Sequence, residues 1–155
     1  MSDSSPWRVL AEASEYALLQ RADVLLCRLR KAPTPVVLQA IEGALAQHPT
    51  PMVVVIHAAP SVGLPDTQTR LTASRIMKMS APKIAAWVVV LEGSGFLRSA
   101  LRSVANTVRL IARTRFLLAV VTNAQEAQAW LAEHTSAEVT AADITAPHLG
   151  GRAAS

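Results

Sequence analysis

Residues 52–58 read Met-Val-Val-Val-Ile-His-Ala, and this stretch decides the fold of the chain. It is short, almost wholly apolar and rich in β-branched side chains, which is typical of a strand covered on both faces. We therefore expect it to lie in the centre of a sheet. Residues 85–91, which include Trp87 and three consecutive valines, and residues 116–121 show the same pattern. The sequence thus predicts three buried strands.

Helical patterns occupy the intervals between and after these strands. Apolar side chains recur there at helical spacing, and in the longest segment five of them fall within an arc of about 80°. Thr34 before Pro35, and Asn123 three residues before Glu126, are typical signals of a helix N-terminus. The predicted helices, with capping residues in parentheses, are residues 35–47 (Thr34), 67–79 (Asp66), 96–114 and 123–134 (Asn123).

The N-terminal part predicts an antiparallel hairpin, because a short polar gap separates two stretches of strand character, residues 15–20 and 24–30. The second stretch ends by alternating apolar and charged side chains, which is typical of a strand with one face in solvent. The whole order, β-β-α-β-α-β-α-β-α, predicts an α/β fold with a mixed, largely parallel sheet and right-handed crossovers. We expect residues 1–134 to form this domain and residues 135–155, which lack a periodic face, to form a flexible tail.

Composition limits the class of protein. The 155 residues suffice for one domain, and with 51% hydrophobic and 17% charged residues the chain can bury a full core. No apolar run approaches the roughly 20 residues of a membrane span, and residues 1–6 are polar without a signal segment behind them, so we expect a cytoplasmic protein. The single cysteine, Cys27, lies in an apolar run and is expected to be a buried, inert thiol.

Several segments in a fixed order give the chain a likeness to a known family. They are residues 16–29, 52–56, 86–90, 96–101, 116–118 and 123–131, the last ending in Trp-Leu. Together they resemble the STAS superfamily, the fold of sulfate-transporter and anti-sigma-factor-antagonist domains, and its lipid-pocket relatives of the CRAL-TRIO type. The resemblance implies a bacterial, non-enzymatic regulatory or scaffolding domain that acts through protein–protein contact and forms a homo-oligomer. The alternative is a carrier of a lipid or small hydrophobic ligand.

The chain departs from that family at the end of the central strand. Anti-sigma-factor antagonists carry an Asp-Ser-Ser/Thr-Gly-like element there, in which a kinase phosphorylates the hydroxyl residue. The matching residues 57–64 read His-Ala-Ala-Pro-Ser-Val-Gly-Leu, so the Asp is absent, while Ser61 and Gly63 remain. Ser61 is therefore a candidate phosphorylation site, with a serine in an ordinary turn as the alternative.

The strongest functional signal is a basic ridge on the predicted helix 96–114. It consists of Arg98, Arg102, Arg109 and Arg113. At 100° per residue these side chains fall within about 60° of arc, opposite the apolar stripe, and no acid lies between residues 93 and 115. A ridge of this kind faces solvent, or binds an acidic protein partner, an anionic lipid surface or nucleic-acid phosphates. We retain the acidic protein as the binding hypothesis. Nucleic acid is disfavoured, because no helix-turn-helix or zinc-ligand spacing is present.

No residue set predicts catalysis, a metal site or a cofactor. The four histidines show no metal-ligand spacing, and Gly93 and Gly95 form only part of a nucleotide-binding glycine loop. His57 ends the central strand, where α/β proteins place functional residues, but a hydrogen-bonded histidine at the rim of the sheet is the simpler interpretation. An enzyme would require His57, Asp66 and Glu92 to converge on a cleft at the strand ends.

Overall fold

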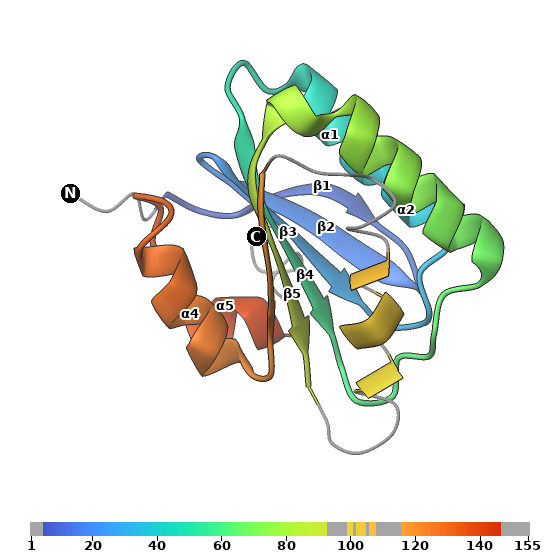
Figure 1. Ribbon diagram of the computed structural model, residues 1–155. Coiled ribbons are helices and arrows are strands. Elements are labelled where there is room, and N and C mark those ends of the chain that lie inside the picture. The colour runs from blue at the N-terminus through green and yellow to red at the C-terminus, as the bar shows by residue number, and fades with distance from the viewer. Residues whose placement is uncertain (1–4, 93–98, 101, 105, 108–115, 147–155) are drawn as a thin grey trace.

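A sheet forms the middle layer of the protein, and helices cover both of its faces (Figure 1). The computed structural model describes residues 5–92, 99–100, 102–104, 106–107 and 116–146. Within these residues the sheet has six strands in the order β1-β2-β3-β4-β5-β6, so strands that follow one another in the chain also pair in space. The strands are β1 (Arg8–Glu12), β2 (Tyr16–Arg21), β3 (Val24–Leu29), β4 (Met52–Ala58), β5 (Ile84–Leu91) and β6 (Leu117–Val121).

The pairing directions divide the sheet into two parts. β1, β2 and β3 are antiparallel neighbours, whereas β3, β4, β5 and β6 are parallel. This arrangement confirms the predicted α/β fold with a mixed, largely parallel sheet and an N-terminal antiparallel hairpin. β4 is buried along its whole length, as expected for the central strand. β1 is an addition that the sequence does not predict, and its residues are only partly buried at the edge of the sheet.

Helices α1 (Pro35–Gln47) and α2 (Thr67–Met79) cover one face of the sheet, and a 3₁₀ turn (Ala81–Lys83) leads from α2 into β5. Both helices have the predicted bounds. The Asp66 carboxylate caps α2 by accepting a 2.8 Å hydrogen bond from the Thr69 N–H, which is the main reason that the pKa of Asp66 is lowered. Thr34 occupies the N-cap position of α1, but its side chain makes no capping hydrogen bond. Of the predicted helix 96–114, the described residues 99–100, 102–104 and 106–107 are helical.

Helices α4 (Ala124–Ala132) and α5 (Ala141–Thr145) lie on the opposite face of the sheet (Figure 1). Asn123 caps α4 as predicted, because its side chain accepts a 2.8 Å hydrogen bond from the Glu126 N–H. α5 lies within residues 135–155, the segment that the sequence assigns to the flexible tail.

The structure differs from the predicted tail over residues 135–146. Ala137, Val139 and Ile144 are buried and pack with α4 and the sheet in one apolar core. A segment that buries such side chains is part of the domain, although its composition of Ala, Thr and Ser shows no helical or strand period. Residues 147–155 of the predicted tail lie outside the described residues.

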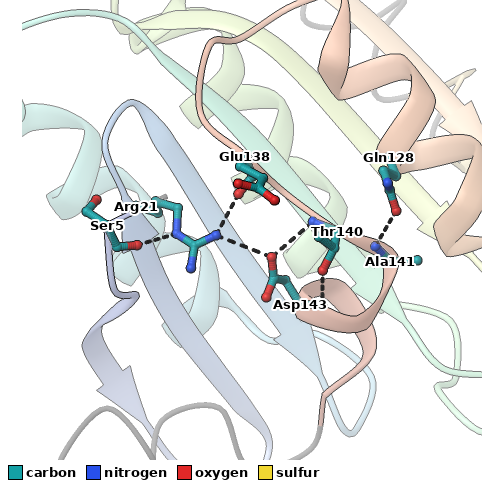
Figure 2. Close-up of polar contacts among 7 residues, drawn as sticks. All are labelled: Ser5, Arg21, Gln128, Glu138, Thr140, Ala141 and Asp143. Carbon is teal, nitrogen blue, oxygen red and sulfur yellow. Dashed lines mark hydrogen bonds and ion pairs between the residues drawn. The ribbon is translucent and has the colours of Figure 1, made fainter. Parts of the chain in front are cut away.

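Arg21 at the end of β2 holds this C-terminal segment against the sheet (Figure 2). Its guanidinium donates hydrogen bonds to the backbone carbonyls of Ser5 and Glu138 and lies 3.3 Å from the Asp143 carboxylate. Asp143 also completes a capping box with Thr140 at the start of α5. One arginine therefore joins three parts of the chain: the N-terminal segment, β2 and α5.

Each inner strand contributes side chains to two separate cores. On β3, Leu25 and Cys27 pack toward α1 and α2, whereas Val24 and Leu26 pack toward α4 and α5. All six residues of β3 are buried. The prediction that the end of this strand has one face in solvent is therefore wrong, because α5 packs on β3 and removes that face from water.

Candidate functional site

Three parallel strands end side by side, and side chains near their ends form a row across the sheet. Arg28 on β3 pairs in register with His57 on β4, and His57 pairs with Val90 on β5. Arg28 lies two and four residues after Leu26 and Val24 and so on the same face of β3, which is the face that α4 and α5 cover. Ligands of parallel α/β sheets bind outside the carboxyl ends of the strands. The row therefore lies where this class of fold places its binding sites.

His57 and Glu92 form a hydrogen-bonded pair at this edge. His57 is buried, and its Nε2 donates a 2.8 Å hydrogen bond to Glu92 Oε2. The interpretation of His57 as a hydrogen-bonded histidine at the sheet rim is thereby confirmed. The Glu92 side chain is 29% exposed, so the pair reaches solvent. Asp66, the third residue that an enzyme would need, instead caps α2.

Arg28 is the residue of this row that sequence reasoning missed. Its side chain is buried, and its Nε and Nη2 atoms have no hydrogen-bond partner among the described residues. Burial is the main reason that the pKa of Arg28 is lowered, and the nearby charge of Arg30 lowers it further. The alternation of charged and apolar residues at the end of β3 indicates only a solvated face. The helix that packs on β3, α5, comes more than a hundred positions later in the chain.

An apolar pocket lies on the other face of the sheet, bounded by β3 to β6, by helices α1 and α2, and by Val104 of the helical residues 102–104. Its volume is about 120 Å³. Cys27 and Trp87 line it from the sheet, and Val37 and Ala73 line it from the helices. Burial raises the pKa of the Cys27 thiol to about 12, so the sulfur stays neutral, as expected for an inert thiol. The pocket therefore offers an uncharged, hydrocarbon-like surface on its sheet side.

The residues predicted to bind a partner or to be modified are placed only in part. Of the basic ridge, Arg102 is exposed on a helical segment, and Arg98, Arg109 and Arg113 lie outside the described residues. An acidic partner, an anionic lipid surface and self-association therefore stay predictions. Ser61 is exposed in a turn in which the Val62 N–H donates a 3.0 Å hydrogen bond to the Ala59 carbonyl. Its phosphorylation also stays a prediction.

The described residues limit the kinds of site that this part of the chain can form. No cluster of three or more His, Cys, Asp or Glu side chains in this part of the chain is placed to hold a metal ion. Within the same residues, no helix combines the length and apolar character needed to cross a bilayer.

Comparison of the chain with protein-family models, curated proteins and solved structures finds no significant match. The resemblance to the STAS superfamily therefore stays a prediction.

Proposed function

We propose that the protein binds a small apolar molecule in the pocket between α1, α2 and the sheet. The observation that carries this proposal is the pocket itself, which is lined by apolar side chains of the core on that face and is partly open to solvent. Protein interiors are packed as densely as organic crystals, and voids larger than a water molecule are few. Side chains around a void lose dispersion contacts, and a ligand of matching shape restores them.

The volume limits the size of the ligand. The pocket of about 120 Å³ is slightly smaller than an engineered apolar cavity of about 150 Å³ that stays dry and binds benzene. Pockets for drug-sized ligands measure about 300–1,000 Å³. Between the two predicted kinds of cargo, a lipid or a small hydrophobic molecule, this size favours the second. A single ring or a short hydrocarbon chain fits.

Two polar residues of α2, Thr69 and Arg70, line the pocket with the apolar parts of their side chains. The Arg70 guanidinium donates hydrogen bonds to the Pro65 carbonyl at 3.3 Å and the Thr67 hydroxyl at 3.1 Å, which leaves its aliphatic stem to line the pocket. The buried Thr69 hydroxyl contributes to the lowered pKa of Asp66 but makes no hydrogen bond of good geometry. That hydroxyl presents no surface to the pocket, whose accessible lining is apolar throughout, so the ligand needs no polar group.

Benzene and phenol are suitable probes, because they differ by the one hydroxyl group. We expect both to raise Tm and to change tryptophan fluorescence, since Trp87 lines the pocket. A ligand at 100 times its Kd stabilises a protein by about 2.7 kcal/mol, which corresponds to a shift of several degrees in Tm. Native mass spectrometry of the freshly purified protein would report the mass of any ligand retained from the cell.

A matched pair of substitutions separates the pocket from the rest of the core. Ala73→Met fills the pocket from α2 and is expected to abolish both responses. Ala40→Met makes the same change at another half-buried alanine that packs on the same core but does not line the pocket, and it should keep both responses. The proposal fails if the wild-type protein responds to neither probe, or if Ala73→Met responds as the wild-type protein does.

A further inference from the structure

Arg28 is a buried cation whose charge no described residue neutralises at close range. Arg28 is only 5% exposed, and its Nε and Nη2 atoms make no hydrogen bond to the described part of the chain. None of the ion pairs in that part includes it. A guanidinium group is not deprotonated in proteins, and a buried charge without a partner is strongly unfavourable. Folded proteins keep such a group where something else supplies the opposite charge.

The two acids whose charges act on the pKa of Arg28 already have other partners. Glu12 and Asp143 both act on its pKa through their charge. Glu12, however, lies 3.5 Å from Arg30, and Asp143 lies 3.3 Å from Arg21. Each of these two carboxylates is thereby paired, and Arg28 carries the surplus positive charge of the group.

The position of Arg28 suits a ligand that enters from the carboxyl edge of the sheet. His57 is its neighbour in register on β4, and the carboxylate of Glu92 holds the His57 ring at 2.8 Å. Glu92 remains partly exposed, so this side of the row borders on solvent. Glu92 is thus also paired, with the Nε2 atom of His57.

We propose that Arg28 binds a small molecule through a carboxylate or phosphate group at the carboxyl ends of β3 and β4. Nε and Nη2 lie on the same edge of a guanidinium, so their N–H bonds run parallel and match two oxygens of one carboxylate or phosphate. These are the two atoms that lack partners. The anion site lies on the face of the sheet opposite the apolar pocket, so it does not depend on the function proposed for that pocket.

The test uses inorganic phosphate and acetate as probes of the two oxyanion classes. Tm of the full chain is measured while sodium phosphate or sodium acetate is added, against sodium chloride at the same ionic strength. We expect at least one of the two anions to raise Tm beyond the effect of chloride, in a response that saturates. A response to phosphate alone or to acetate alone identifies the class of ligand.

Substitutions at two positions of the same strand end locate the response. Arg28→Met keeps an unbranched side chain but removes the charge, and it is expected to lose the anion-dependent rise in Tm. Lys31→Met removes an exposed cation just beyond the same strand that is not part of this group of charges, and it should keep the rise. The proposal is overturned if neither anion exceeds chloride on the wild-type protein. It is equally overturned if Arg28→Met responds as the wild-type protein does, because the anions then bind elsewhere.

A direct measurement covers the case in which Arg28→Met does not fold. The Nε–H resonance of Arg28 in ¹⁵N-labelled wild-type protein can be assigned by its absence from the spectrum of Arg28→Lys. We expect this resonance to shift and saturate with the binding anion and to stay in place with chloride. A resonance that does not move with phosphate or acetate contradicts the proposal.

Discussion

Replacing Ile144 with alanine tests whether residues 135–146 belong to the folded domain. Ile144 is fully buried in α5 and packs in the core between α4, α5 and the sheet. The substitution removes Cγ1, Cγ2 and Cδ1, and at about 0.8 kcal/mol per buried carbon group the transfer term alone is about 2.4 kcal/mol. The cavity that remains adds to this cost. We therefore expect the free energy of unfolding to fall by about 3 kcal/mol.

The assay is urea unfolding followed by circular dichroism, with Thr145→Ala as the control. Thr145 is the next residue of α5, and its exposed side chain donates only to the Ala141 carbonyl, at 3.1 Å. Its substitution should change the free energy of unfolding by less than about 0.5 kcal/mol. Equal m-values for the variants would show that the same surface is exposed on unfolding.

The reasoning is refuted if Ile144→Ala and Thr145→Ala unfold at the same urea concentration. That result would mean that α5 is not packed on β3 in solution and that the tail predicted from composition begins at residue 135. A loss of about 3 kcal/mol in Ile144→Ala alone would show that the segment is part of the core, because an exposed tail residue contributes almost nothing to stability.

Two other predictions concern a titration and a helix cap. Burial raises the pKa of Cys27 from 9.0 to about 12, so the unfolded state loses its thiol proton first as the pH rises. The free energy of unfolding should therefore fall by about 1.4 kcal/mol between pH 8 and pH 10, and urea titrations of Cys27→Ala at both pH values should lack this part of the loss. Asn123→Ala removes the 2.8 Å bond to the Glu126 N–H and should cost about 1 kcal/mol, whereas Asn123→Ser should keep most of the stability. An unchanged Tm in Asn123→Ala would show that this cap does not contribute.

Local chemistry explains which elements the sequence predicts. Pro35 and Asp66 start their helices by fixing a backbone angle or by accepting a hydrogen bond from the first turn, and both effects act within a few residues. The all-apolar β4 is likewise readable because a strand buried on both faces needs no polar residues. The sequence does not predict β1 and α5, for two different reasons. β1 is an edge strand with little burial, and in α5 the capping signal Thr140-x-x-Asp143 stands in a segment without a periodic apolar face.

The candidate sites depend on contacts that no short stretch of sequence contains. His57 can be placed at the sheet rim from the end of its strand, but the burial of Arg28 requires a segment that packs on β3 from far along the chain. The apolar pocket forms because side chains from α1, α2, four strands and Val104 leave a space between them. Periodicity shows which side chains face the core, and it carries no information on whether they fill it.

The sequential strand order has a consequence for the chain while it is being synthesised. Each strand from β2 onward pairs with its predecessor, so a growing chain can extend an existing sheet one strand at a time. The contact between Arg21 and Asp143 is different, because 122 positions separate the two residues. The face of β2 and β3 that α5 covers therefore stays exposed to solvent until residues 135–146 have left the ribosome. During that interval this bare face is the surface that a chaperone would meet.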